Sequence, residues 1–398
     1  MNTFRRNVPL LAISQALMMS SMSLLLTTTA LVGLDMAPDK ALATLPIAVI
    51  FIAVMLTSIP AAMLMERVGR KPAFMFSTFF GMAGGLLATV AIFQQNFWLF
   101  VTSGILVGMF NAFGNYFRFA AADIVEPSLK SKAISAVLIG GVVAAIVGPN
   151  LANLTRDSFS DFTFAGSYIS IIVLYFIAFI TLSFLKLPHV HHSERVKDTS
   201  VARPLFVIAM QPKFVVALLC AMLGYGVMSF VMTATPLAMH GHAHSFADTS
   251  FVISWHVLGM YAPSFFTGHL IQRYGVLKIM FIGGLLAVGC VVANLLGNSV
   301  THYWVGLILL GVSWNFLFIG GTTLLTETYR PEERGKAQAL NDFVIFTTVA
   351  VASLTAGALQ HNFGWQMVNL GVLPLIAVIL LSILWLGIKF KKNKVKDK

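Results

Sequence analysis

The sequence predicts an all-α membrane protein in which twelve transmembrane helices form two pseudo-symmetric six-helix bundles. Three observations predict this fold class. The chain is 58% hydrophobic and 10% charged, with a mean hydropathy of +0.84, whereas a soluble domain carries about 25% charged residues. Its basic residues gather at one set of predicted helix ends, and its two halves carry matching charged turns. The composition therefore excludes a soluble globular protein.

Apolar runs of about 20 residues or more recur along the chain, each long enough to cross a hydrocarbon core of about 30 Å. They lie near residues 9–33, 41–65, 72–93, 97–122, 133–155, 166–187, 213–239, 249–271, 279–297, 303–327, 337–360 and 365–388. The predicted domains are an N-terminal bundle (1–187), a central cytoplasmic loop (188–212), a C-terminal bundle (213–388) and a basic cytoplasmic tail (389–398).

The basic residues are distributed asymmetrically about these runs. Of the 26 Lys and Arg residues, only Lys40 and Arg156 fall on one side of the predicted membrane. Because Lys and Arg near membrane ends are retained on the inside, both termini should be cytoplasmic and the protein should lie in the inner membrane. The net charge of +11 then reflects topology and contact with the lipid bilayer, and no nucleic-acid partner is expected.

Two short charged turns of the first half recur in the second half at nearly the same offset. The segment 62–71 resembles 268–275, and the segment 123–133 resembles 327–337 in its acidic, proline, basic and alanine positions. Two independent repeats at nearly one spacing indicate a duplicated bundle.

The first of these turns resembles the loop signature of the major facilitator superfamily between its second and third helices. The matching positions are Arg67, Gly69, Arg70 and Lys71. Ala62 stands where that signature has Gly, and Glu66 where it has Asp. The resemblance implies a secondary active transporter in which two bundles rock about a midplane site by alternating access.

The charged turns are expected to form and break interhelical contacts as a cytoplasmic gate. The residues expected to take part are Glu66, Arg67, Gly69, Arg70, Arg118, Asp123, Arg273, Glu327 and Arg334. Arg118 could pair with Asp123 or with the turn at Glu66, or its head could reach the membrane interface.

Polar and aromatic side chains within the predicted helices mark a candidate substrate pocket. Buried amides are costly when unpaired, so they should face the bundle interior, either to bind substrate or to bond neighbouring helices. The candidate substrate-binding residues are Gln15, Asn111, Asn115, Tyr225, Trp255, His256, Trp314 and Asn315. Such a pocket suits a neutral or amphipathic small organic molecule with ring character.

Asp342 and His256 are the candidates for proton coupling, because ionisable residues within membrane helices are functional hypotheses and histidine titrates near neutral pH. Asp342 could instead pair with Lys336 or Arg118, and His256 could be a neutral packed side chain. A proton gradient is the default that the resemblance implies, and passive or exchange transport is the alternative.

The pair Gly148-Pro149 in the fifth run resembles the signature of the drug:proton antiporter branch, although Ala152 and Asn153 replace its closing glycines. This match favours efflux of a drug or metabolite. Uptake of a vitamin or siderophore-like metabolite is the alternative within transport, and a non-transporting receptor or sensor is the alternative of a different class.

No phosphate-binding loop and no catalytic constellation is evident, so neither ATP-driven transport nor an enzyme is expected. His240, His242 and His244 alternate, which could align imidazoles along an extended segment for a metal, but a solvated loop is the favoured interpretation. We expect no metal, no cofactor and a monomer.

Overall fold

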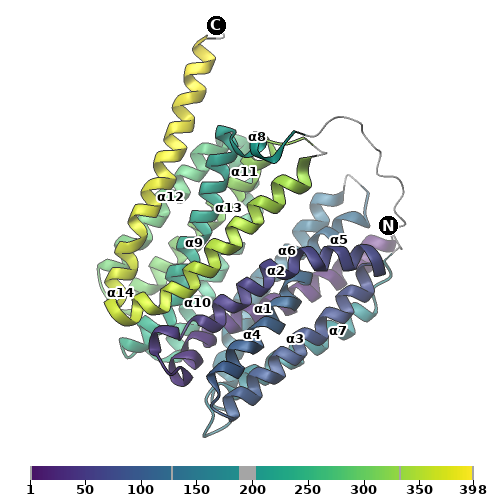
Figure 1. Ribbon diagram of the computed structural model, residues 1–398, viewed down its shortest axis with the longest axis vertical. Helices are drawn as coiled ribbons and strands as arrows, with labels where there is room; N and C mark the ends of the chain where they lie inside the picture. Colours follow the sequence, from purple (N-terminus) through teal and green to yellow (C-terminus); the bar gives the residue numbers. More distant parts are fainter. Residues whose placement is uncertain (1, 127–128, 188–202, 331–332, 397–398) are drawn as a thin grey trace.

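The computed structural model describes residues 2–126, 129–187, 203–330 and 333–396, and the regular elements in these ranges are all helical. The elements are α1 (Asn2–Met36), the 3₁₀ turn η1 (Lys40–Leu42), α2 (Leu45–Val68), α3 (Arg70–Phe93), α4 (Phe97–Gly114), α5 (Phe117–Asp123), α6 (Lys130–Thr155), α7 (Ala165–Ser183), α8 (Leu205–Ala209), α9 (Pro212–Gly241), α10 (Phe246–Tyr261), α11 (Ser264–Tyr274), α12 (Val276–Leu295), α13 (Val300–Thr326) and α14 (Arg334–Lys396). Figure 1 shows two groups lying side by side, α1–α7 in purple and blue and α9–α14 in green and yellow.

In the described ranges, ten helices are long and apolar enough to cross a membrane. The last of these contains a kink at Gly364, where φ is 76°, so it comprises two crossings. Helices α10 and α11 are each short, but they follow one another across a two-residue turn and together make another crossing. The count therefore agrees with the twelve crossings predicted from hydropathy.

Two of the predicted helices are broken. The fourth is divided into α4 and α5 at Asn115 and Tyr116, and the eighth is divided into α10 and α11 at Ala262 and Pro263. We predicted both as continuous runs. Pro263 has no N–H to continue the helix ladder, which is the physical reason for the second break.

The turns after α2 and α11 confirm that the two halves are related. Gly69 and Gly275 both adopt φ 88°, with ψ of 159° and 147°, and each ends one helix and begins the next. A positive φ is accessible to glycine at little cost because it has no Cβ. The aligned glycines of the sequence repeat thus build the same tight turn twice.

The helix ends that carry Arg67, Lys130, Lys213 and Arg334 form what we call the basic end, and the other ends form the opposite end. At the opposite end, Thr44 at the start of α2 bonds to α14: its hydroxyl donates to the Leu354 carbonyl (3.3 Å) and accepts from the Gly357 N–H (3.2 Å). The two halves therefore pack closely there.

The short helix α8 crosses the basic end of the second half (Figure 1). Just before it, Arg203 binds Glu333, which is fully buried in the turn before α14, through Nη2 to Oε2 (2.6 Å) and Nε to Oε1 (2.8 Å). Of the predicted central loop, residues 188–202 lie outside the described residues, as do residues 397–398 of the predicted tail.

Candidate functional site

A cavity of about 150 Å³ lies between the two halves, with walls from α1, α2, α4, α6, α9, α10 and α14. Small-molecule sites usually measure about 300–1,000 Å³. In this conformation the cavity is therefore smaller than a typical small-molecule site. Both bundles supply its walls, as expected for a site on the axis that relates two repeats.

Carboxamides of the N-terminal half form one wall. Gln15 of α1, Asn111 of α4 and Asn115 at the α4–α5 break line the cavity together. The Asn111 Nδ2 donates to the Val107 carbonyl (2.9 Å), whereas the Gln15 Oε1 is buried and has no hydrogen-bond partner among the described residues. The sequence predicted all three as substrate contacts, and the fold brings them together.

Aromatic side chains of the C-terminal half form the facing wall. Tyr225 and Tyr261 line the cavity. Trp314 lies behind them, with ring centroids 5.3 Å from Tyr225 and 5.9 Å from Tyr261, and it stacks on Phe318 at 5.0 Å. Trp314 is therefore a second layer that holds the tyrosine rings in place rather than part of the cavity surface.

Methionines make up much of the remaining surface, and sequence reasoning missed them. The methionines that line the cavity are Met18, Met19, Met22, Met228, Met232 and Met260. Thioether side chains are flexible and polarisable, and they adapt well to flat aromatic surfaces. A signal was available, since Met22 and Met228 occur at the same repeat offset as Ser23 and Ser229.

Besides Trp314, three predicted substrate residues do not line the cavity. Trp255 is 39% exposed at the protein surface and contacts Trp304. His256 is fully buried, with its Nδ1 2.8 Å from the Leu307 carbonyl of α13. The Asn315 amide donates to the Met260 carbonyl (2.7 Å) beside the break between α10 and α11. The His256 Nδ1 and the Asn315 amide thus bond to neighbouring helices, as the structural alternative for such side chains anticipated, whereas the His256 Nε2 has no partner among the described residues.

Two opposite charges, one from each half, lie outside the cavity lining. Arg118 of α5 and Asp342 of α14 belong to different halves and lie within electrostatic range of each other. Asp342 accepts a hydrogen bond from Asn341 (3.1 Å), and the Arg118 guanidinium lies 4.9 Å from the ring centroid of Phe119. Neither takes part in a direct ion pair within the described part of the chain.

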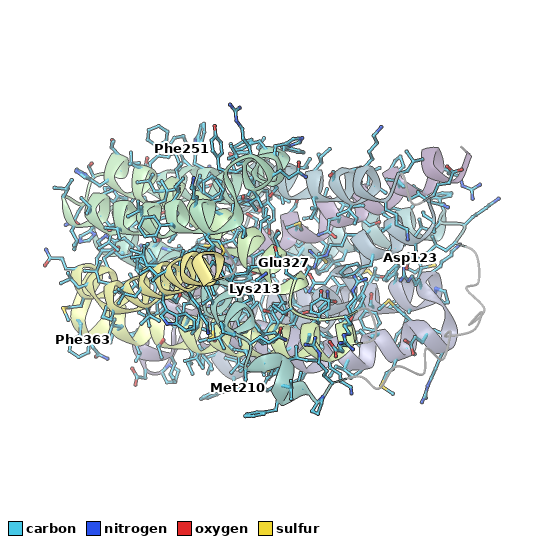
Figure 2. The ribbon with its side chains drawn as sticks, turned by 90° about the horizontal axis from the view of Figure 1, so that it is seen from above. Asp123, Met210, Lys213, Phe251, Glu327 and Phe363 are labelled. Carbon is cyan, nitrogen blue, oxygen red and sulfur yellow. The ribbon has the colours of Figure 1, made fainter. Side chains whose placement is uncertain are left out.

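The predicted gate residues at the basic end pair within each half in this conformation. Arg70 binds Asp123 at 2.5 Å in the first half, and Glu327 binds Lys213 at 2.8 Å in the second. Figure 2 shows Lys213 and Glu327 adjacent to each other, with Asp123 well apart in the other half. The remaining charged side chains predicted for this gate are solvent-exposed: Glu66, Arg67, Arg273 and Arg334.

At the opposite end, an aromatic clamp joins the halves. Phe164, from the first half, contacts Phe246 at the start of α10 in an edge-to-face pair with centroids 4.9 Å apart. The Arg156 guanidinium lies 5.6 Å from the centroid of Phe164 and 5.4 Å from that of Phe246. A cation over aromatic faces is attractive, so these contacts hold the two halves together at the opposite end.

The three alternating histidines do not form the extended segment that a metal site would need. His240 lies within α9. The His242 Nδ1 is 2.7 Å from the Tyr303 hydroxyl, and the His244 Nε2 is 2.6 Å from the Asn298 carbonyl. His189, His191 and His192 of the predicted central loop lie outside the described residues.

A sequence model of the Major Facilitator Superfamily matches residues 11–244 and 217–398. The chain belongs to the major facilitator superfamily. It is accordingly a multi-pass membrane transporter of the secondary type and not an enzyme. The resemblance in the loop around Arg67 and the two-bundle fold class are both confirmed.

Relatives within the superfamily cover nearly the whole chain. The riboflavin transporter RfnT of Brucella anthropi is 42% identical over 381 residues, which are 96% of this chain and 95% of that protein. The uncharacterized MFS-type transporter YddS of Bacillus subtilis is 25% identical over 397 residues, 96% of this chain and 91% of that protein.

Solved structures share the fold at low sequence identity. The nucleoside transporter NupG aligns with a TM-score of 0.72 and 16% identity, covering 95% of this chain and 99% of that chain. The human organic anion transporter MFSD10 aligns with a TM-score of 0.67 and 13% identity, covering 96% and 99%. These likenesses concern the arrangement of the helices.

Proposed function

We propose that this protein carries riboflavin, or a closely related flavin, across the membrane by alternating access. The observation that carries the proposal is the 42% identity to the Brucella anthropi riboflavin transporter RfnT over 96% of this chain. That relative favours the vitamin-uptake alternative over the efflux of drugs, which the Gly148-Pro149 pair of α6 had suggested.

The cavity chemistry supports a neutral aromatic heterocycle as cargo. Its walls combine thioethers, the tyrosines Tyr225 and Tyr261, and the carboxamides Gln15, Asn111 and Asn115. Sulfur and aromatic rings contact the faces of a flat ring system, while carboxamides both donate and accept hydrogen bonds at its edges. No Lys, Arg, Asp or Glu of the described chain lines this cavity, which suits an uncharged molecule such as riboflavin.

The distribution of charge supports an orientation with the basic end in the cytoplasm. The clamp of Arg156, Phe164 and Phe246 then closes the cavity on the outer side. In that orientation, this conformation is the one from which an imported substrate would be released into the cytoplasm.

Proton coupling through Asp342 is the mechanism we infer for driving uptake. Asp342 is an exposed carboxylate on α14 that interacts electrostatically with Arg118 of the other half, so its charge can bias the approach of the two halves. His256 is a weaker candidate, because its imidazole is enclosed against α13 and does not line the cavity.

Uptake of labelled riboflavin by proteoliposomes, with and without an imposed pH gradient, tests both proposals. We expect the gradient to drive accumulation in the wild type and to have no effect on the Asp342→Asn variant, because a carboxamide cannot carry the proton. Glu126→Gln, which removes an exposed carboxylate near the end of α5, is the control and should accumulate riboflavin normally.

The outcomes separate the two proposals. If neither the pH gradient nor the Asp342→Asn substitution changes riboflavin flux, riboflavin remains the proposed substrate and proton coupling is rejected. An absence of riboflavin flux in the wild type, with the protein folded, would reject the substrate.

A further inference from the structure

The carboxamide of Gln15 is buried at the cavity without a partner. The Gln15 side chain lines the cavity, the residue is 7% exposed, and its Oε1 makes no hydrogen bond within the described part of the chain. Burying an amide oxygen without a partner is unfavourable. A cavity-lining residue that holds a buried polar atom without a partner is therefore a candidate for contact with the ligand.

The neighbours of Gln15 on α1 use their own backbone instead. The Ser14 hydroxyl donates to the Leu10 carbonyl (2.9 Å), the Ser21 hydroxyl to the Leu17 carbonyl (3.1 Å) and the Thr27 hydroxyl to the Ser23 carbonyl (2.8 Å). Back-bonding of this kind is the ordinary solution for a hydroxyl within a membrane helix. Gln15 differs from them in keeping its acceptor free.

Packing fixes the stem of the Gln15 side chain. Gly140 of α6 lies against it so closely that a Cβ at Gly140 would come within 3.1 Å of the Gln15 Cγ and 2.8 Å of the Ala16 N. The glycine thus lets α6 approach α1 closely at this level. With its stem held against α6, the Gln15 side chain is restricted to a position beside the cavity.

We propose that Gln15 is a specificity-determining residue that recognises the imide edge of the flavin ring by hydrogen bonding. This proposal rests on the proposed function. That edge presents an N–H beside a carbonyl oxygen. The Gln15 oxygen can accept from the imide N–H while its NH₂ group donates to the neighbouring carbonyl, so the two groups are complementary in donors and acceptors.

The rest of the cavity agrees with this placement. Ser23 lies eight residues further along α1, about 12 Å along the helix axis, and its buried hydroxyl also has no partner among the described residues. Met19 and Met22 lie between the two positions along the same wall. The wall thus offers the Gln15 carboxamide at one end, methionine thioethers in the middle and the Ser23 hydroxyl at the other end. This order suits a ring system that carries a polyol chain.

The test compares riboflavin with 3-methylriboflavin, in which a methyl group replaces the imide hydrogen, by quenching of flavin fluorescence on the purified full-length protein. We expect the wild type to prefer riboflavin by about 10–100-fold, the range for a buried group left unpaired. In Gln15→Met the two ligands should bind equally, with riboflavin weakened to the level of the methylated analogue. Ser14→Ala, which removes a hydroxyl bonded only to its own helix, is the matched control and should keep the preference.

Several results would overturn the inference. Equal binding of both flavins by the wild type would reject it while leaving the proposed function standing, and so would a preference that persists in Gln15→Met. If that variant does not fold, Gln15→Asn keeps a carboxamide one methylene shorter and should retain part of the preference. A folded wild type that binds neither flavin would reject the proposed function itself, and the role of Gln15 with it.

Discussion

Asn111 and Asn315 occupy corresponding positions in the two sequence repeats, yet their side chains have different environments. Asn111 lines the cavity. Asn315 donates to the Met260 carbonyl and to the Ser264 hydroxyl (2.7 Å each), and it accepts from the Thr267 hydroxyl (2.6 Å). Buried polar groups are almost always hydrogen-bonded. The Asn315 amide lies beside a broken helix, and it bonds to the polar groups that the break leaves without partners in their own helix. The carboxamides of the site consequently come from one half alone.

Glu333 is a second residue whose role appears only in the fold. Its carboxylate receives the Arg203 guanidinium and also the backbone N–H groups of Arg203 (2.9 Å) and Arg330 (3.0 Å). The hydrogen bonds from the Arg203 side chain, aided by these N–H groups, lower the pKa of Glu333 from 4.5 to about 2. The charged carboxylate thus ties the chain before α8 to the turn before α14.

The pH dependence of stability follows from that pKa. Because the pKa of Glu333 is lower in the folded state, its ionisation stabilises the protein above pH 4.5, and this contribution is lost as the pH falls toward about 2. Glu333→Gln should lower the melting temperature at neutral pH. The melting temperature of the variant should also fall less on acidification than that of the wild type. Thermal unfolding between pH 7 and pH 3 measures both effects. Equal wild-type and variant curves throughout that range would contradict the prediction.

At the scale of elements, the break between α10 and α11 is bridged by a side chain of a neighbouring helix. Pro263 cannot donate to the helix ladder, and the Asn315 side chain of α13 bridges the two segments at Met260 and Ser264. Tyr261, directly before the break, lies against Gly141 of α6 in the other half. By bonding to both segments, Asn315 therefore holds in place the end of α10 that contacts the first half.

Replacing this bridge should destabilise the protein. Asn315→Leu keeps a similar volume but leaves the Met260 carbonyl without its side-chain donor, at a cost of about 1–3 kcal/mol for each buried group left unsatisfied. Asn150→Leu is the matched control, because Asn150 is exposed and bonds only to the Ile146 carbonyl of its own helix (2.7 Å). Thermal unfolding in detergent should show a clear loss for Asn315→Leu and little change for Asn150→Leu. Equal losses would show that the bridge is not stabilising.

At the scale of the whole molecule, the contacts between the halves are unevenly distributed. Thr44 and the clamp of Arg156, Phe164 and Phe246 join the halves at the opposite end. At the basic end the described ion pairs join helices of the same half. A transporter that alternates between two conformations must break one set of contacts to form another, so the clamp should govern the balance between them.

Weakening the clamp should shift that balance. Removing an aromatic pair and a cation–π contact forfeits about 0.5–2 kcal/mol, which changes the population ratio by a factor of about 2–30. In Phe246→Ala, spin labels at the exposed residues Ser160 and Asn298 of the opposite end should move apart, and labels at Glu126 and Lys336 of the basic end should approach. Phe251→Ala, on the exposed face of the same helix (Figure 2), is the control. Unchanged distance distributions in Phe246→Ala would show that the clamp does not set the balance.

The helices and their symmetry could be predicted because the bilayer imposes simple rules. A crossing segment needs a certain apolar length and must satisfy its own backbone hydrogen bonds, so hydropathy alone marks it. The glycines at 69 and 275 occur in matching charged turns, and both adopt the same backbone angles. The breaks at Asn115 and Pro263 were not predicted, because each lies inside a run that is long and apolar enough as a whole to be assigned as one crossing.

The sequence was sufficient for the number of crossings, the basic end, the internal repeat and the superfamily, since each follows from local composition or from short motifs. It also offered Gln15 and Asn315 as equal candidates for the site, and they differ completely in the fold. Whether a polar side chain faces the cavity or a neighbouring helix depends on how each helix is rotated about its axis. That rotation is set by close contacts between distant segments, such as Gly140 against Ala16 and Gly141 against Tyr261, and no local pattern of residues specifies it.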